Sequence, residues 1–142
     1  MSYEWRRENK SDKEKYEDDY IYELNDGKKI VIHQGQLIKD ELDFLGIDAV
    51  GRTVWDAVLF DLNKSDFRKS IVMSKFFEIH PEYVKDKHIV EIGAGTGLPG
   101  ILCSILGASH VTLTEYFDLE LLEQNVKDNI AENSADVKHL FW

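Results

Sequence analysis

The segment Glu91-Ile92-Gly93-Ala94-Gly95-Thr96-Gly97 carries glycine at three alternating positions. It follows His88–Ile92, an apolar run that predicts a short buried strand, and it precedes Leu98–Leu106, an apolar run that predicts a helix. Glycines in a strand-to-helix turn let the backbone turn tightly and let a ligand approach without a Cβ in the way. The segment therefore predicts a ligand-binding loop within an α/β fold.

The acidic residues around this loop indicate which ligand it suits. The spacing is G-x-G-x-G rather than the dinucleotide pattern G-x-G-x-x-G, and Glu91 stands two positions before the first glycine. That carboxylate would repel a pyrophosphate, but it would accept a cationic ligand. S-adenosyl-L-methionine carries a sulfonium, an ammonium and free ribose hydroxyls, so we expect it as the cofactor.

A second acidic residue, Glu115, supports the same ligand. It lies at the carboxyl end of the next predicted strand, 18 residues after Gly97. An acidic side chain at this place accepts both ribose hydroxyls in Rossmann-like sites. The alternative is a carboxylate at the end of a strand that contacts only solvent.

The rest of the second half alternates strands with helices. Strands are predicted at His110–Thr114 and Val137–Phe141, and an amphipathic helix at Leu119–Ile130 between them. The helix Leu98–Leu106 has proline in its first turn and glycine just past its end, as expected for helix termini. This alternation predicts a parallel sheet of strand order 3-2-1 with right-handed crossovers.

The first half is less regular. Tyr20–Leu24 and Lys29–Gln34 flank Asp26-Gly27, which predicts a β-hairpin with a type I′ turn. Residues 1–19 are mostly charged and predict a mobile tail, or else a segment that orders on a partner. One helix is predicted to begin at Thr53. A second is predicted to end before Pro81, with these apolar residues on one face: Phe67, Ile71, Val72, Phe76 and Ile79.

Composition limits the class of protein. The chain has 142 residues, about one domain, and its 43% hydrophobic content is enough for a core. A net charge of −10 argues against a nucleic-acid-wrapping protein and suits a basic protein partner, or solubility alone. The single cysteine excludes a disulfide framework and a Cys-based zinc site, and the five histidines show no metal-binding spacing. With no apolar run of about 20 residues and no signal peptide, we expect a cytoplasmic protein without nucleic-acid or membrane partners, with the nucleus as a second location.

Several segments together resemble the seven-β-strand protein-lysine methyltransferases of the methyltransferase-like class. They are Thr53–Ala57 (TVWDA), Val90–Gly100 (VEIGAGTGLPG), Val111–Glu115 (VTLTE) and Leu121–Val126 (LLEQNV). The resemblance covers residues 20–142. It implies an incomplete Rossmann-like class I methyltransferase of about three parallel strands, with residues 20–51 as a hairpin lead-in and residues 52–142 as the cofactor-binding half.

The resemblance also implies a set of cofactor-binding residues. Beside the loop and Glu115, the family places a tryptophan of the V-W-D-A element and one at the end of the third strand in the pocket. Both tryptophans could instead be core aromatics. The family more often has Asp where Glu115 stands. The predicted cofactor-binding residues are Trp55, Glu91, Gly93, Ala94, Gly95, Gly97, Glu115 and Trp142.

The implied function is N-methylation of a lysine in a protein substrate, with a chaperone or a translation factor as candidate partner. Methylation of another nitrogen and a non-catalytic cofactor-binding fragment are the alternatives, and no residue is identified as catalytic. Residues 60–71 form a 12-residue insertion relative to the family. The family also continues with four more strands, so we expect His88–Ile92 to be an open edge and the 142-residue chain alone to be inactive.

Overall fold

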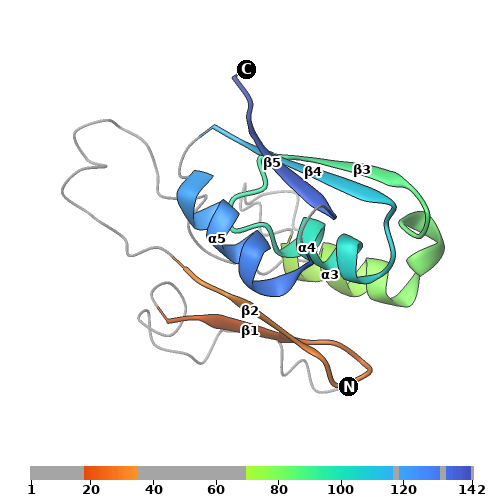
Figure 1. Cartoon of the computed structure of the whole chain (residues 1–142). Helices are drawn as coiled ribbons and strands as arrows, with labels where there is room; N and C mark the ends of the chain where they lie inside the picture. Colours follow the sequence, from red (N-terminus) through yellow and green to blue (C-terminus); the bar gives the residue numbers. More distant parts are fainter. Residues whose placement is uncertain (1–17, 35–69, 117–118, 132–133, 142) are drawn as a thin grey trace, which may run out of the picture.

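The computed structural model describes residues 18–34, 70–116, 119–131 and 134–141, which form three layers (Figure 1). A parallel sheet forms one layer, α-helices lie on one of its faces, and a β-hairpin packs on the far side of the helices. The elements in chain order are β1 (Tyr20–Glu23), β2 (Lys29–Ile32), α3 (Ser70–Ile79), the 3-10 helix η2 (Pro81–Tyr83), β3 (His88–Ile92), α4 (Leu98–Ile105), β4 (His110–Glu115), α5 (Leu119–Asn129) and β5 (Ala135–His139).

The sheet has the order β3-β4-β5 with all strands parallel, so the predicted α/β fold and strand order are confirmed. Ile89 pairs with Val111, which in turn pairs with Ala135. The last strand begins two residues before the predicted start at Val137. Val111 and Leu113 of the central strand are fully buried against the helices. Because the three strands are parallel, their carboxyl ends lie at the same edge of the sheet.

Strand β3 differs from the buried strand predicted for His88–Ile92. Its bounds are as predicted, but Val90 is 64% and Ile92 69% exposed. Alternate residues of a strand point to opposite faces of the sheet, and the described helices cover only one face. An apolar run identifies a strand, but it does not tell which of its faces are covered.

The helices follow the predicted positions. Helix α4 begins just after Gly97, and Gly107 beyond its end has φ +94°, in the left-handed region expected of a C-terminal glycine. Helix α5 ends one residue before the predicted Ile130. The core of this unit lies between these helices and the central strand.

Helix α3 ends before Pro81 as predicted, but its predicted apolar face is wrong. Ile71 and Ser74 are fully buried, whereas Val72 and Phe76 are 41% and 42% exposed, and Ile79 is exposed too. Successive residues of a helix are about 100° apart, so Val72 and Ile71 cannot both face the core directly. The predicted stripe combined two different sides of the helix, and Phe67 lies outside the described residues.

The hairpin is confirmed, but its turn is not type I′. That turn needs positive φ at both central residues, and only Gly27 in this loop has it, at +83°. The Gly27 N–H donates to the Leu24 carbonyl (2.9 Å) and the Leu24 N–H to the Lys28 carbonyl (2.8 Å). The loop thus has three residues, and its glycine takes the left-handed position after the turn.

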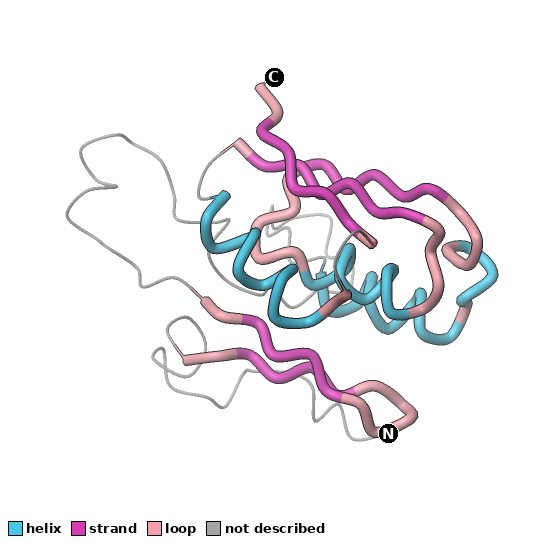
Figure 2. The backbone as a smooth tube through the Cα atoms, viewed as in Figure 1, coloured by secondary structure: helices cyan, strands magenta, loops and turns pink. Residues whose placement is uncertain are grey.

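Apolar side chains fix the hairpin to the helices. Tyr22, Ile30 and Ile32 are almost completely buried and pack in one cluster with Ile71 of α3 and Leu98, Ile101 and Leu102 of α4. Figure 2 shows the two strands running beneath the helices. The hairpin is therefore part of the core and not an appendage.

A carboxylate of α3 holds the turn end of the hairpin. Glu78, whose side chain is 5% exposed, accepts hydrogen bonds from the Tyr22 hydroxyl (2.8 Å), the Asn25 N–H and Lys75 Nζ (3.0 Å). Burial works to raise the pKa of Glu78, but these three donors outweigh it and hold the pKa below its ordinary value. Lys75 also lies over the Tyr22 ring, 4.4 Å from its centre.

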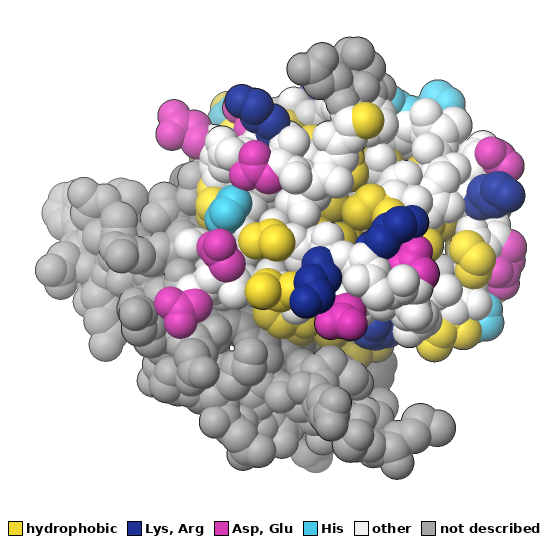
Figure 3. Space-filling view, turned by 60° about the horizontal axis from the view of Figure 1, so that its bottom comes forward, with side chains coloured by type: hydrophobic (Ala, Val, Ile, Leu, Met, Phe, Trp, Pro, Cys, Tyr) yellow, Lys and Arg dark blue, Asp and Glu magenta, His cyan; other side chains and the backbone are white. Residues whose placement is uncertain are grey.

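The exposed surface mixes both charge signs. On the face that Figure 3 turns forward, Lys and acidic side chains alternate with apolar ones over the described part of the chain. Within that part, the model contains no helix with the length and apolar character needed to cross a membrane. Residues 1–17 of the predicted tail, the helix from Thr53 and positions 60–69 of the insertion lie outside the described residues, so the domain division stays a prediction.

Candidate functional site

The glycine loop joins the end of β3 to the start of α4. Its three glycines, Gly93, Gly95 and Gly97, have φ values of +67°, +54° and +83°. These lie in the left-handed region, which other residues rarely adopt. A Cβ on Gly97 would also lie 2.6 Å from Leu122 Cδ1 of α5. The loop therefore needs glycine for its backbone path and, at Gly97, for its contact with α5.

Strand β4 holds this loop from the side. The Ala94 N–H donates to the Thr114 carbonyl (2.9 Å), and the Gly95 N–H donates to Glu115 Oε2 (2.7 Å). The other carboxylate oxygen of Glu115 accepts the Tyr116 N–H (2.7 Å). The structure thus brings Glu115 and the glycine loop together, 20 residues apart in the chain, at the carboxyl edge of the sheet.

Glu91 points elsewhere. Its Oε2 accepts the N–H of Gly100 in the first turn of α4 (2.8 Å), and a Cβ on Gly100 would lie 2.6 Å from that oxygen. Burial raises the pKa of Glu91 to about 8, with the Glu115 charge adding to the rise and the Gly100 N–H opposing it. Because this carboxyl is largely protonated at neutral pH, Glu115 supplies most of the negative charge near the loop.

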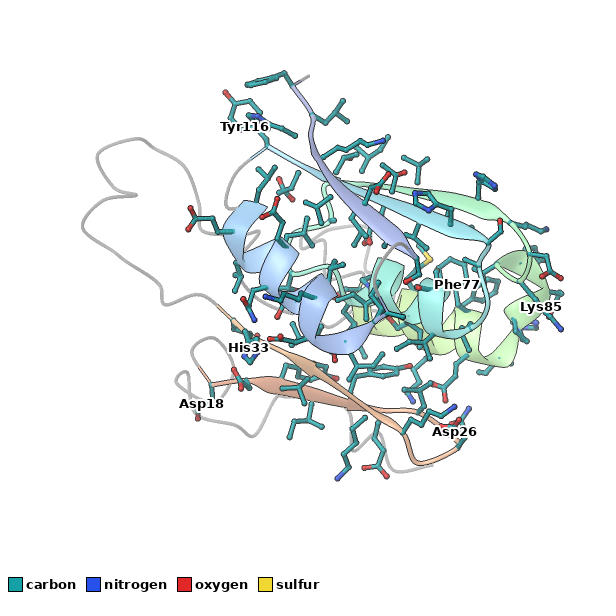
Figure 4. The ribbon with its side chains drawn as sticks, in the orientation of Figure 1. Asp18, Asp26, His33, Phe77, Lys85 and Tyr116 are labelled. Carbon is teal, nitrogen blue, oxygen red and sulfur yellow. The ribbon has the colours of Figure 1, made fainter. Side chains whose placement is uncertain are left out.

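Aromatic rings border Glu115 and were not predicted as part of the site. Tyr116 and Phe141 pack edge to face with ring centres 5.4 Å apart, and the His139 ring lies 3.9 Å from that of Phe141. His139 Nε2 is 2.9 Å from the Tyr116 carbonyl. Figure 4 shows Tyr116 at the end of β4, near the end of the chain. Its position directly after Glu115 was the available signal, since ligands of open α/β sheets bind at this edge.

A hollow of about 340 Å³ lies beside β3 and reaches Ile92 at the carboxyl end of that strand. It is bordered by α3, β3 and the start of α4, and it includes Glu91 and Gly100. None of the three loop glycines lines it, and neither does Glu115. We place the candidate cofactor site at the carboxyl edge of β3 and β4, because the hydrogen bond from the Gly95 N–H to Glu115 brings the glycine loop and this carboxylate together there. In the described ranges, no three His, Cys, Asp or Glu side chains gather as a metal site would require.

The residues at this edge fit S-adenosyl-L-methionine. Gly93 is exposed at the end of β3, so a ligand can reach its backbone. Glu115 forms no ion pair with a Lys or Arg of the described residues, so its charge is available to a cationic ligand. The predicted partners Trp55 and Trp142 lie outside the described residues. Cofactor binding by each of the predicted residues stays a prediction.

Comparison with known proteins identifies the family. A family model described as lysine methyltransferase matches residues 38–142, which include the whole glycine loop and Glu115. The chain belongs to this lysine methyltransferase family. The predicted family and the class I methyltransferase type of fold are thereby confirmed.

Named relatives match this chain over segments of different length. "Protein N-lysine methyltransferase METTL21A" of Xenopus tropicalis is 36% identical over 109 residues, 74% of this chain and 43% of the relative. "EEF1A lysine methyltransferase 3" of the same frog is 38% identical over 95 residues, 66% and 37% of the two chains. "Protein N-terminal and lysine N-methyltransferase efm7" of Neurospora crassa is 41% identical over 54 residues, 38% and 19%. The chain thus spans less than half the length of each of these relatives.

Proposed function

We propose that this family member binds S-adenosyl-L-methionine at the glycine loop and Glu115 and serves the methylation of a lysine Nζ in a protein substrate. The observation that carries the proposal is the hydrogen bond from the Gly95 N–H to Glu115 Oε2 (2.7 Å). It joins the acidic side chain to the loop at the edge where ligands of such sheets bind. The family match supports the reaction type.

The residues of this site bind the cofactor and orient it. The bound cofactor supplies an activated methyl group. Each oxygen of Glu115 already accepts one backbone N–H and keeps lone-pair capacity for a ribose hydroxyl. The loop glycines keep the backbone open to the ligand, and the carboxylate compensates positive charge. The acceptor amine must also be held neutral and in line with the methyl group, and none of the described residues is assigned to this role.

The proposal also covers the protein substrate. The printed name of the relative EEF1A lysine methyltransferase 3 supports a translation factor as partner. A second candidate acceptor is a protein N-terminal amine, favoured by the name of the Neurospora relative. We place the reaction in the cytoplasm, with the nucleus as the alternative.

Methyl transfer can be tested with methyl-labelled S-adenosyl-L-methionine. The full-length protein is incubated with cell lysate and the labelled residue is identified by mass spectrometry. We expect label on a lysine side chain, and less of it with the Glu115→Ala variant. Label on an α-amino group would select the second candidate, and no enzyme-dependent label on any protein would contradict the proposal.

A further inference from the structure

Two asparagines of α5 hold the edge of the hairpin that faces away from β1, at Val31 of β2 and at His33 just after it. Asn129 accepts the Val31 N–H (2.9 Å) and donates to the Val31 carbonyl (2.7 Å). Asn125 repeats the pattern one helical turn earlier, accepting the His33 N–H (2.8 Å) and donating to the His33 carbonyl (3.0 Å). The two carboxamides therefore act on the hairpin as the backbone of a neighbouring strand would.

The geometry of the two elements explains this match. Four residues of an α-helix rise about 6 Å, and two residues of a strand advance about 6.6 Å. Asparagines at positions i and i+4 of α5 therefore face the alternate residues Val31 and His33. The N–H and C=O groups of these two residues point to the same edge of β2. Figure 4 shows His33 at the end of the hairpin, beside α5.

Each asparagine makes a third bond: that of Asn129 stays within α5, from its Nδ2 to the Asn125 carbonyl (2.8 Å), whereas that of Asn125 reaches the glycine loop. Asn125 Nδ2 also donates to the carbonyl of Thr96 (3.0 Å), between Gly95 and Gly97 in the loop. Asn125 is fully buried and Thr96 is 3% exposed, so water cannot replace these bonds. Both hydrogens of one carboxamide are thus used, one by the hairpin and one by the glycine loop.

We propose that Asn125 is a positioning residue that couples the hairpin to the glycine loop. Docking of His33 on α5 fixes the Asn125 carboxamide, which in turn fixes the Thr96 carbonyl and the path of the neighbouring glycines. The hairpin is then part of the cofactor-binding machinery, although none of its residues lines the site. This inference rests on the proposed binding of S-adenosyl-L-methionine.

The signal in the sequence was slight. Asn125 lies within the motif Leu121–Val126, three residues after Leu122 and one before Val126 on the apolar face of the helix. A polar residue at a buried helix position needs partners. Which partners it finds is fixed by segments 29 and 92 residues away.

The test compares Asn125→Ala with the matched control Asn129→Ala in the full-length protein. Each variant loses two bonds to the hairpin, but only Asn125→Ala loses the bond to Thr96. Calorimetry with S-adenosyl-L-methionine measures affinity, and a thermal melt measures stability. We expect Asn125→Ala to bind at least tenfold more weakly, and Asn129→Ala to melt earlier but bind within twofold of wild type.

Equal losses in both variants, or no loss in Asn125→Ala, would overturn the inference. If Asn125→Ala does not fold, hydrogen exchange of the wild-type protein decides, because coupling between two sites is reciprocal. The cofactor should slow exchange of the His33 amide, and an unchanged rate would overturn the coupling. A wild-type protein that does not bind the cofactor would instead refute the proposed function.

Discussion

Gly27 in the hairpin and Gly97 in the glycine loop have the same backbone angle, φ +83°, but different surroundings. A Cβ on Gly27 would meet nothing within 4 Å. A Cβ on Gly97 would meet Leu122 Cδ1 at 2.6 Å and Leu113 Cδ2 at 3.1 Å. The hairpin glycine is required by a turn alone, whereas the loop glycine is also required by packing between β4 and α5.

The same contrast holds for the two regions as a whole. Among the strands that the structure describes, β1 and β2 pair only with each other, and an apolar face and side chains such as Glu78 and Asn125 attach the hairpin to the helices. The parallel unit is held by backbone pairing of β4 with both neighbours. Changes in the loop should therefore cost more stability than equivalent changes in the hairpin.

The largest effect is expected from Gly97→Ala compared with Gly27→Ala. Both variants place an alanine in the left-handed region, which costs about 1–2 kcal/mol. Only Gly97→Ala also overpacks the contact with Leu122, which adds roughly 1–3 kcal/mol. Chemical denaturation measures both free energies of unfolding. Equal losses would show that Leu122 moves aside at no cost in free energy, so that its packing does not require glycine at position 97.

A smaller effect of opposite sign is expected from Glu91→Gln. The pKa of Glu91 is about 8 in the folded protein, against an ordinary value of 4.5. The folded state keeps a proton that the unfolded state releases between these values, so wild-type stability falls as pH rises through this window. Glutamine does not titrate and can still accept the Gly100 N–H.

Glu91→Gln should therefore be more stable than wild type at pH 8, on the order of 1 kcal/mol, with a smaller difference at pH 5. Thermal melts of both proteins at the two pH values measure this. A difference that does not change with pH would show that the folded protein does not hold Glu91 protonated. A loss of cofactor affinity in this variant would support the predicted role of Glu91 in cofactor binding.

The smallest effect is expected in the hairpin, from His33→Gln. His33 Nδ1 lies 2.9 Å from Asp19 Oδ1 and Nε2 lies 3.1 Å from Asp128 Oδ2 of α5. The bond to Asp19 is the main cause that raises the pKa of His33 above its ordinary value of 6.5; burial opposes the rise, and the bond to Asp128 adds to it. This stabilisation is complete below pH 6.5 and disappears as pH rises through the folded-state pKa.

Removing His33 should therefore lower the melting temperature slightly at pH 6 and not at pH 9. The control is the melting temperature of the wild-type protein at the same two pH values. An equal loss at pH 9 would mean that His33 acts through packing and not through its charge.

The sequence predicted those features that depend on local pattern. The strand, glycine loop and helix around Gly93–Gly97 follow from periodicity and glycine spacing, and the position of Glu115 follows from the end of the next strand. Three features could not be predicted because distant segments decide them. They are the exposure of Val90, the turn of Glu91 toward Gly100, and the two-sided bonding of Asn125.

The proposed cofactor site is tested most directly by the affinity of full-length Glu115→Ala for S-adenosyl-L-methionine, measured by calorimetry beside wild type. Two hydrogen bonds to a charged acceptor contribute about 1.5–3 kcal/mol each at most, so we expect a loss of roughly tenfold or more. Glu115→Gln, which can still accept the Gly95 N–H, separates loss of charge from loss of loop support. Unchanged affinity in a folded Glu115→Ala protein would contradict the site described at the carboxyl edge of β3 and β4.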